Sequence, residues 1–172
     1  MHGDTRAGPD TPVHHDVRVG HVHLRGGDIE RATAFYRDAI GLSVTLDGRL
    51  FGLPAVFLAA GDYHHHIALN AFDGEGAEPA PRRYAGLHHF ALLHPSRAEL
   101  GRAVARLRRS GHPIDAAEDH GGTVAVYLRD PDGNGVELSY DRPRSEWFDA
   151  DGRPIVKAMP FDPDTLIGEE AA

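Results

Sequence analysis

The chain lacks cysteine altogether, and it contains no long apolar run. Without thiols it can form neither a disulfide framework nor a thiolate metal site, so any metal ion must be held by imidazole and carboxylate groups. No apolar segment approaches the roughly 18 residues that a membrane-spanning helix needs. Residues 1–17 also lack the apolar segment of a signal peptide. We therefore expect a cytoplasmic protein that does not bind membranes.

Positive charge is scarce as well. Asp and Glu outnumber Lys and Arg by 26 to 18, which gives a net charge of −8. Because such a surface repels phosphate, nucleic acid is not an expected partner. What the chain has in excess is histidine, with 13 residues, several of them in strand-like segments. These histidines are the first place to look for a metal site.

The sequence repeats one order of elements. Residues 18–72 predict a strand, a helix beginning at Asp28, and three further strands. Residues 87–141 predict the same order, with the second helix beginning at Ser96. Each βαβββ module is too small to bury its sheet alone, so we expect an α+β domain in which the two modules pack as a curved mixed sheet around a site.

Three segments lie outside these modules. Residues 1–17 have no periodicity and predict a flexible N-terminal tail. Residues 73–86 are rich in glycine, proline and acidic residues and predict a linker. Residues 142–172 predict an extended C-terminal tail that lies over the domain.

Strand alternation places three candidate ligands on equivalent faces. The apolar residues Val22 and Leu24 are expected to face the helix-covered core. Because side chains alternate along a strand, His21 then points to the opposite face. His89 occupies the same position in the second module, and Glu137 takes the same orientation in its last strand. Two neutral imidazoles and one carboxylate form the facial triad that binds Fe(II) or a similar ion and leaves positions open. Each residue alone is more often structural, but the shared position, face and repeat favour a metal site.

The segment from His120 to Glu137 has a distinctive spacing. His120 is followed by five residues, then by Val126-Tyr127, by an Asp-Pro-Asp-Gly turn at 130–133, and by Glu137. This pattern resembles the signature of type I extradiol ring-cleaving dioxygenases, within the vicinal oxygen chelate superfamily. The resemblance covers about residues 19–150.

The resemblance implies a metal-dependent dioxygenase that acts with dioxygen on a catecholic or related small aromatic compound. It implies Fe(II) as the metal, with Mn(II) or another divalent ion as alternatives, and we expect a homodimer. The resemblance implies three roles. His21, His89 and Glu137 match the metal ligands, and His65 matches the acid–base group. His120 and Tyr127 match residues that hydrogen-bond substrate or oxygen.

Two histidines compete for the acid–base position. Alternation along Ile67–Leu69 places His66 and His64, rather than His65, on the face of the site, and a bulge or a strand end is needed to turn His65 inward. His66 therefore remains an alternative. His23 shares the face of His21 and is expected, with His66, to line the substrate pocket.

Two other functions fit the same sequence. A non-redox metalloenzyme of the superfamily, such as an isomerase, lyase or resistance transferase, would use the triad but would not need His120 and Tyr127. A metal-free protein that binds a planar drug would need none of these residues.

Overall fold

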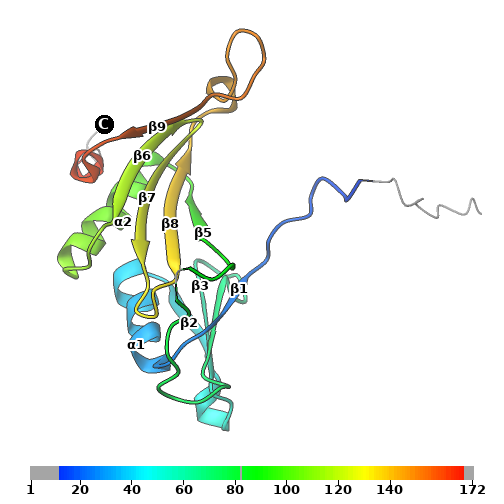
Figure 1. The fold of residues 1–172 in the computed structure, drawn as a ribbon, viewed down its shortest axis with the longest axis vertical. Coiled ribbons are helices and arrows are strands. Elements are labelled where there is room, and N and C mark those ends of the chain that lie inside the picture. Colours follow the sequence, from blue (N-terminus) through cyan, green and yellow to red (C-terminus); the bar gives the residue numbers. More distant parts are fainter. Residues whose placement is uncertain (1–11, 82, 169–172) are drawn as a thin grey trace, which may run out of the picture.

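The computed structural model of the chain describes residues 12–81 and 83–168 (Figure 1). The strands and helices follow the order βαβββ twice, which confirms the predicted α+β fold class. Among the described residues, no helix is both long and apolar enough to cross a membrane.

The first module forms a four-stranded sheet in the order β1-β4-β3-β2. β1 and β4 run parallel, and the other neighbours run antiparallel. Its elements are β1 (Val22–Arg25), α1 (Ile29–Ala34), which continues as the π-helical turn η1 (Phe35–Ile40), β2 (Ser43–Asp47), η2 (Gly48–Phe51), β3 (Ala55–Ala59) and β4 (Ile67–Asn70).

The second module repeats this order as β5-β8-β7-β6 and adds one strand from the C-terminal segment. That strand, β9, pairs antiparallel with β6 and ends the sheet. The elements are β5 (Phe90–His94), α2 (Arg97–Arg109), β6 (Ala116–Gly121), β7 (Thr123–Arg129), β8 (Gly135–Asp141), η3 (Arg144–Glu146), β9 (Val156–Pro160) and η4 (Pro163–Leu166). Residues 142–168 therefore contain regular structure as well as extended chain.

Both helices begin where the sequence predicts. The Asp28 carboxylate accepts a hydrogen bond from the Arg31 backbone N–H at 2.9 Å, and the Ser96 hydroxyl oxygen accepts one from the Glu99 N–H at 3.2 Å. These bonds satisfy N–H groups that have no partner inside the helix. The first helical segment ends at Gly41, whose φ of 94° is readily adopted only by glycine.

The two modules contact each other on their helical side. The Tyr36 hydroxyl donates to the Asp130 carboxylate at 2.9 Å, and both residues are buried. The Arg106 guanidinium donates to the Ile40 carbonyl at 2.9 Å. Asp130 opens the turn between β7 and β8, so this turn of the signature also joins the modules.

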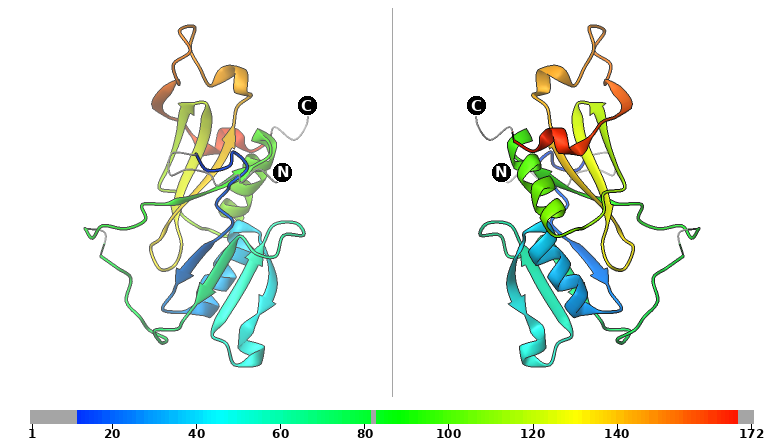
Figure 2. Two further views of the ribbon diagram at one scale, coloured as in Figure 1. Left: turned by 90° about the vertical axis from the view of Figure 1, so that its right-hand side faces the viewer. Right: turned by 90° about the vertical axis from the view of Figure 1, so that its left-hand side faces the viewer.

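Each helix covers one face of its own sheet, and both helices lie on the same side of the molecule (Figure 1). We call the opposite face of each sheet its helix-free face. The modules are stacked along the long axis, with the first below the second in Figure 2. β1 and β5 each have a single hydrogen-bonded neighbour, so each of them ends its sheet.

Candidate metal centre

The helix-free face of the second sheet carries four of the predicted site residues. Tyr127 in β7 lies directly opposite Glu137 in β8, and Glu137 lies opposite Ala91 in β5. Directly opposed residues in neighbouring strands share a face. His89 precedes β5 and His120 lies near the end of β6, and both reach this face. The strand alternation read from the sequence therefore gives the observed orientation of Glu137.

His89 and Glu137 form the innermost pair. The His89 Nε2 lies 2.9 Å from a Glu137 carboxylate oxygen, and only 11% of the Glu137 side chain is exposed. Two donor atoms at neighbouring positions of an ion, each about 2.1 Å from it, would lie about 3 Å apart. The observed spacing therefore fits two ligands of one divalent ion. A buried carboxylate also requires a cation.

A glycine allows this close approach. At Gly135, a Cβ atom would collide with the backbone carbonyl of His88 and would touch the His89 side chain. Without a side chain at this position, the start of β5 lies directly beside β8. The backbone therefore holds His89 next to Glu137.

Tyr127 and His120 form a second pair beside the first. The Tyr127 hydroxyl lies 2.8 Å from the His120 Nε2. Burial, followed by the negative charges of Glu137 and Glu118, raises the pKa of Tyr127 to about 12. The phenol therefore stays protonated at neutral pH and can donate a hydrogen bond.

The helix-free face of the first sheet carries a cluster of rings. The His21 and His65 ring centroids are 4.5 Å apart, and those of Phe57 and His65 are 5.1 Å apart. Phe57 and His23 both lie opposite Ala68, so Phe57 shares the face of His23 and His21. Loss of solvent around the ring, followed by repulsion from neighbouring histidines, lowers the pKa of His65.

The structure places His65, rather than His66, beside His21. The His66 backbone pairs with both neighbouring strands, but its ring lies against Tyr63, with the centroids 4.7 Å apart, and its Nδ1 accepts from the Ala60 N–H. β4 begins only at Ile67, so strand alternation does not extend to His65. The roles of His65 and His66 remain predictions.

Two further side chains in this cluster were not among the predicted site residues. Phe57 packs on His65, and the alternation of the segment 55–59 together with its register to β4 could have placed it on this face. The His64 Nδ1 lies 2.7 Å from the His65 Nδ1. Strand alternation in the sequence places His64 on this face, but only the adjacency of the two residues points to its contact with His65.

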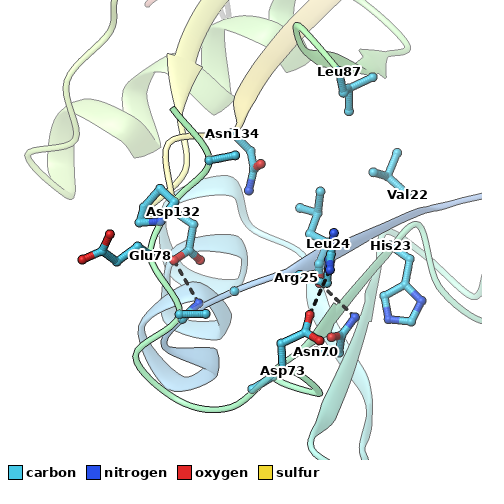
Figure 3. A pocket seen from close by; sticks show the side chains of 16 residues that line it. Val22, His23, Leu24, Arg25, Asn70, Asp73, Glu78, Leu87, Asp132 and Asn134 are labelled. Carbon is cyan, nitrogen blue, oxygen red and sulfur yellow. Dashed lines mark hydrogen bonds and ion pairs between the residues drawn. The ribbon is translucent and has the colours of Figure 1, made fainter. Parts of the chain in front are cut away.

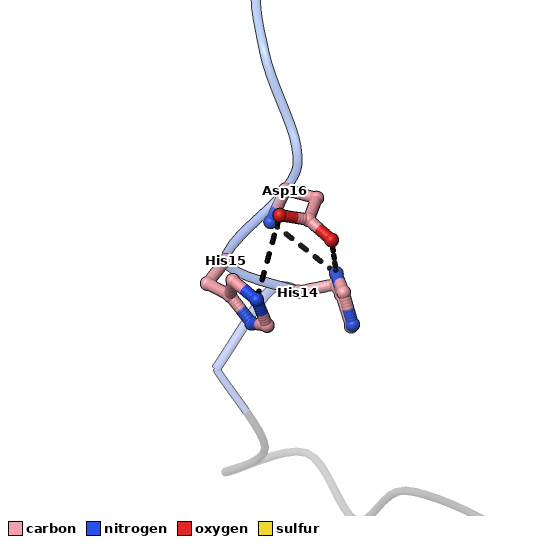
Figure 4. A group of neighbouring side chains, drawn as sticks. All are labelled: His14, His15 and Asp16. Atoms are coloured by element: carbon pink, nitrogen blue, oxygen red, sulfur yellow. Dashed lines mark hydrogen bonds and ion pairs between the residues drawn. The ribbon is translucent and has the colours of Figure 1, made fainter.

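Within a single chain, the three predicted metal ligands do not all come together. Among the described residues, the only group of at least three His, Asp or Glu side chains with ligand atoms within 4.8 Å of one another is His14, His15 and Asp16 (Figure 4). These three residues are exposed sequence neighbours that contact one another, so we assign no metal site to them. His21 thus lies apart from the His89–Glu137 pair.

A cavity of about 450 Å³ runs along the outer edge of β1 (Figure 3). It is bounded by β1, by the linker and by the turn that contains Asp132. Among the site residues predicted from the sequence, only His23 lines it, and the His23 ring lies 6.2 Å from that of Phe72. The cavity lies beside an unpaired strand edge rather than over His89 and Glu137.

Comparison with known proteins decides the family. Residues 18–138 match the model of the Glyoxalase/Bleomycin resistance protein/Dioxygenase superfamily. The chain belongs to this superfamily. This confirms the resemblance inferred from the segment 120–137 at the level of the superfamily, which is the same vicinal oxygen chelate group.

Two curated relatives represent two different reactions. Over 117 residues the chain is 36% identical to the catechol-2,3-dioxygenase of Bacillus subtilis (strain 168). The aligned stretch covers 68% of this chain but only 39% of that protein. Over 127 residues it is 28% identical to the lactoylglutathione lyase of Salmonella typhimurium (strain LT2), covering 71% of this chain and 91% of the lyase. The chain thus spans well under half of the length of the dioxygenase that it matches.

A solved structure supports the fold. The glyoxylase/bleomycin resistance protein/dioxygenase domain from Frankia sp. EAN1pec superposes with a TM-score of 0.63 and covers 74% of this chain and 94% of that one. At 20% identity, this similarity concerns the fold alone.

Proposed function

We propose that this protein is a metal-dependent extradiol dioxygenase that opens the ring of a catecholic or related small aromatic compound. The observation that carries the proposal is the hydrogen-bonded Tyr127–His120 pair beside the His89–Glu137 pair on one sheet face. A metal-dependent lyase or isomerase would need the ligands but not the second pair. The greater identity to the catechol dioxygenase than to the lyase points the same way.

The residues that would hold the metal are His89 and Glu137 from the second sheet and His21 from the first. Two imidazoles and one carboxylate suit Fe(II), and Mn(II) is the alternative. Three protein ligands leave coordination positions for substrate and oxygen. A bound Fe(II) ion would supply a binding site for both catechol oxygens and a redox centre for dioxygen.

The remaining residues handle protons and orientation. His65, which is not one of the proposed metal ligands, accepts a proton from a catechol hydroxyl and later returns it. Tyr127 keeps its proton at neutral pH. It donates that proton in the hydrogen bond to the His120 Nε2, and its phenol oxygen accepts a hydrogen bond from a substrate hydroxyl. Both atoms of dioxygen enter the product as one ring C–C bond beside the hydroxylated carbons breaks, so no external reductant is required.

In this proposal the site is completed between two copies of the chain. Each module carries one half of it, with His21 and His65 in the first and His89 and Glu137 in the second. β1 and β5 are equivalent strands that both end their sheets, so β1 of one copy can lie beside β5 of another. Leu93, on the helix-free face of β5, is 62% exposed, as expected for a surface that a second copy covers.

Complementation between inactive variants tests this arrangement. His21→Ala and Glu137→Ala each damage both sites of a homodimer. A heterodimer of the two variants would contain one intact site if each site draws on both copies. Random pairing should then restore about one quarter of the wild-type metal content and turnover. No recovery of metal in a purified heterodimer would contradict a shared site, whatever reaction the protein catalyses.

Anaerobic loading with Fe(II), followed by a catechol and air, tests the reaction itself. We expect oxygen uptake and a yellow ring-fission product, both of which should be absent in Glu137→Ala. Formation of lactoylglutathione from glutathione and methylglyoxal without oxygen uptake would instead indicate a lyase. A His14→Ala/His15→Ala variant serves as the control for ions that bind the exposed N-terminal histidines.

A further inference from the structure

We propose that the C-terminal strand β9 is a positioning element that determines which nitrogen of His120 carries a proton. The His120 Nδ1 lies 2.8 Å from the backbone carbonyl oxygen of Lys157, and its Nε2 lies 2.8 Å from the Tyr127 hydroxyl. The catalytic consequence rests on the proposed function, whereas the protonation pattern does not depend on it.

The Lys157 carbonyl determines which nitrogen of the His120 ring is protonated. A carbonyl oxygen only accepts hydrogen bonds, so the His120 Nδ1 must carry a hydrogen whether the ring is neutral or charged. In the neutral ring, Nε2 then holds the lone pair and accepts from the Tyr127 hydroxyl. While the ring is neutral and β9 is in place, the hydrogen bond between Tyr127 and His120 therefore runs from the hydroxyl to Nε2.

Loss of this carbonyl would remove the constraint. A neutral His120 could then carry its hydrogen on Nε2 and present a donor to Tyr127. The hydroxyl of Tyr127 would have to accept, and its own hydrogen would turn elsewhere. β9 thus acts on the site through His120, without itself reaching Tyr127.

β9 lies outside the part of the chain that matches the family model, which ends at residue 138. It is held on β6 by backbone pairing and by charges around Asp119. The Asp119 carboxylate accepts from Arg142 at 2.8 Å and lies 3.4 Å from the Lys157 ammonium. Just before β9, Ile155 lies over Gly121, where a Cβ atom would come within 2.5 Å of the Ile155 side chain.

The chain beyond β9 is anchored on α2. Leu166 is only 1% exposed and packs against Gly101, where a side chain would collide with the Leu166 carbonyl. Arg108 donates to the Asp164 carboxylate at 2.7 Å. β9 is therefore fixed at both ends. This anchoring holds the Lys157 carbonyl oxygen in position beside the His120 Nδ1.

Covering the edge of β6 is the other role that such a strand could have. Edge protection would need the backbone pairing of β9 but would place no demand on the protonation of His120. The two roles therefore differ in one measurable property, the tautomer of this ring.

Nitrogen NMR of ¹⁵N-histidine-labelled protein at pH 8 measures that property. With 13 histidines in the chain, the His120 signals are assigned by comparison with His120→Gln. We expect the full-length protein to show the neutral His120 with its hydrogen on Nδ1. A hydrogen on Nε2 in the intact protein would overturn the proposal without the use of any strand variant.

Two variants and one control extend the test. A chain shortened to end at Pro154 lacks β9, and Met159→Pro removes a backbone N–H from β9 at an exposed position, so it leaves the core untouched. In both we expect the tautomer mixture of free imidazole, unchanged metal content and about 10- to 100-fold slower turnover. Lys157→Arg keeps both the carbonyl and the positive charge near Asp119 and should resemble the wild type.

Met159→Pro decides the outcome if the shortened chain does not fold. An unchanged tautomer in a folded Met159→Pro protein whose β9 amides exchange freely would overturn the proposal. A changed tautomer with wild-type turnover would support the assignment of the His120 proton to β9 and overturn its consequence for catalysis. If the full-length protein cleaves no catechol but has the expected tautomer, the proposed function fails and the assignment of the His120 proton stands.

Discussion

The four repeated strands have the same order in both sheets, but the helix-free faces of the two sheets differ. The second carries the Glu137 carboxylate beside an imidazole and the Tyr127 phenol beside another imidazole. The cluster on the first consists of imidazoles and an aromatic ring. By strand register, Ala68 in the first sheet is the counterpart of Glu137, since His23 lies opposite Ala68 as Ala91 lies opposite Glu137. The repeat therefore supplies two histidine positions but only one carboxylate.

This difference bears on the reaction. Two carboxylates and two histidines would occupy four positions of a bound ion, whereas one carboxylate leaves an additional position open. A reaction that brings together an aromatic diol and dioxygen needs that room. The loss of symmetry between the modules thus matches the function proposed here.

The largest expected effect is on metal binding by the carboxylate that only the second sheet has. Glu137→Ala should lower metal affinity by at least about 100-fold, because the ion loses its only anionic protein ligand. Metal analysis after dialysis measures this loss. Asp141→Asn, on the same face of the same strand, is the matched control and should retain the metal. Equal loss in both variants would mean that general damage to β8 is responsible.

The second effect concerns the histidine cluster of the first sheet. His65→Ala should keep the metal and reduce turnover by about 10²- to 10⁴-fold, the range for loss of a general acid–base group. His66→Ala should stay close to the wild type, since its ring lies against Tyr63. Steady-state rates at fixed metal content compare the two. The reverse ranking would assign the acid–base role to His66.

The third effect isolates the phenol of the second sheet. Tyr127→Phe should keep the metal and slow turnover by about 10- to 100-fold, because it removes a hydrogen bond without opening a cavity. His89→Ala, by contrast, should lose metal. Full activity in Tyr127→Phe would remove the main reason to prefer a dioxygenase over a non-redox enzyme.

The smallest effect concerns the pH dependence of stability. Burial lowers the pKa of His94, which bonds to the carbonyls of Leu92 and Ser139. Because the folded pKa lies below the unfolded value of about 6.5, the free energy of unfolding should fall as the pH drops below 6.5 and level off below the folded pKa. His94→Asn should weaken this dependence in urea titrations at several pH values. An unchanged pH profile in His94→Asn would assign the dependence to another group.

Much of this fold follows from local chemistry. Asp28 and Ser96 begin the helices because their side chains bond the free N–H groups of the first turn. The orientation of Glu137 follows from the period of two along β8. Such features depend on a few neighbouring residues, so the sequence predicts them.

Other features depend on distant partners. His65 turns toward His21 because β4 begins only after it, which alternation cannot reveal. β9 has little pattern of its own, and it forms because β6 offers an unpaired edge and α2 receives Leu166. The contact between Lys157 and His120 uses a backbone carbonyl, which every residue type has.

The order of residues alone determined the duplicated modules, the superfamily and the face on which each candidate ligand lies, because periodicity and capping act over a few residues. Only the tertiary structure decided that one chain holds His21 apart from His89 and Glu137, and that a C-terminal strand reaches His120. Both features depend on which strand edges pair. Strand edges pair through backbone N–H and C=O groups, which are nearly the same for every residue type, so the sequence does not show which edges will meet.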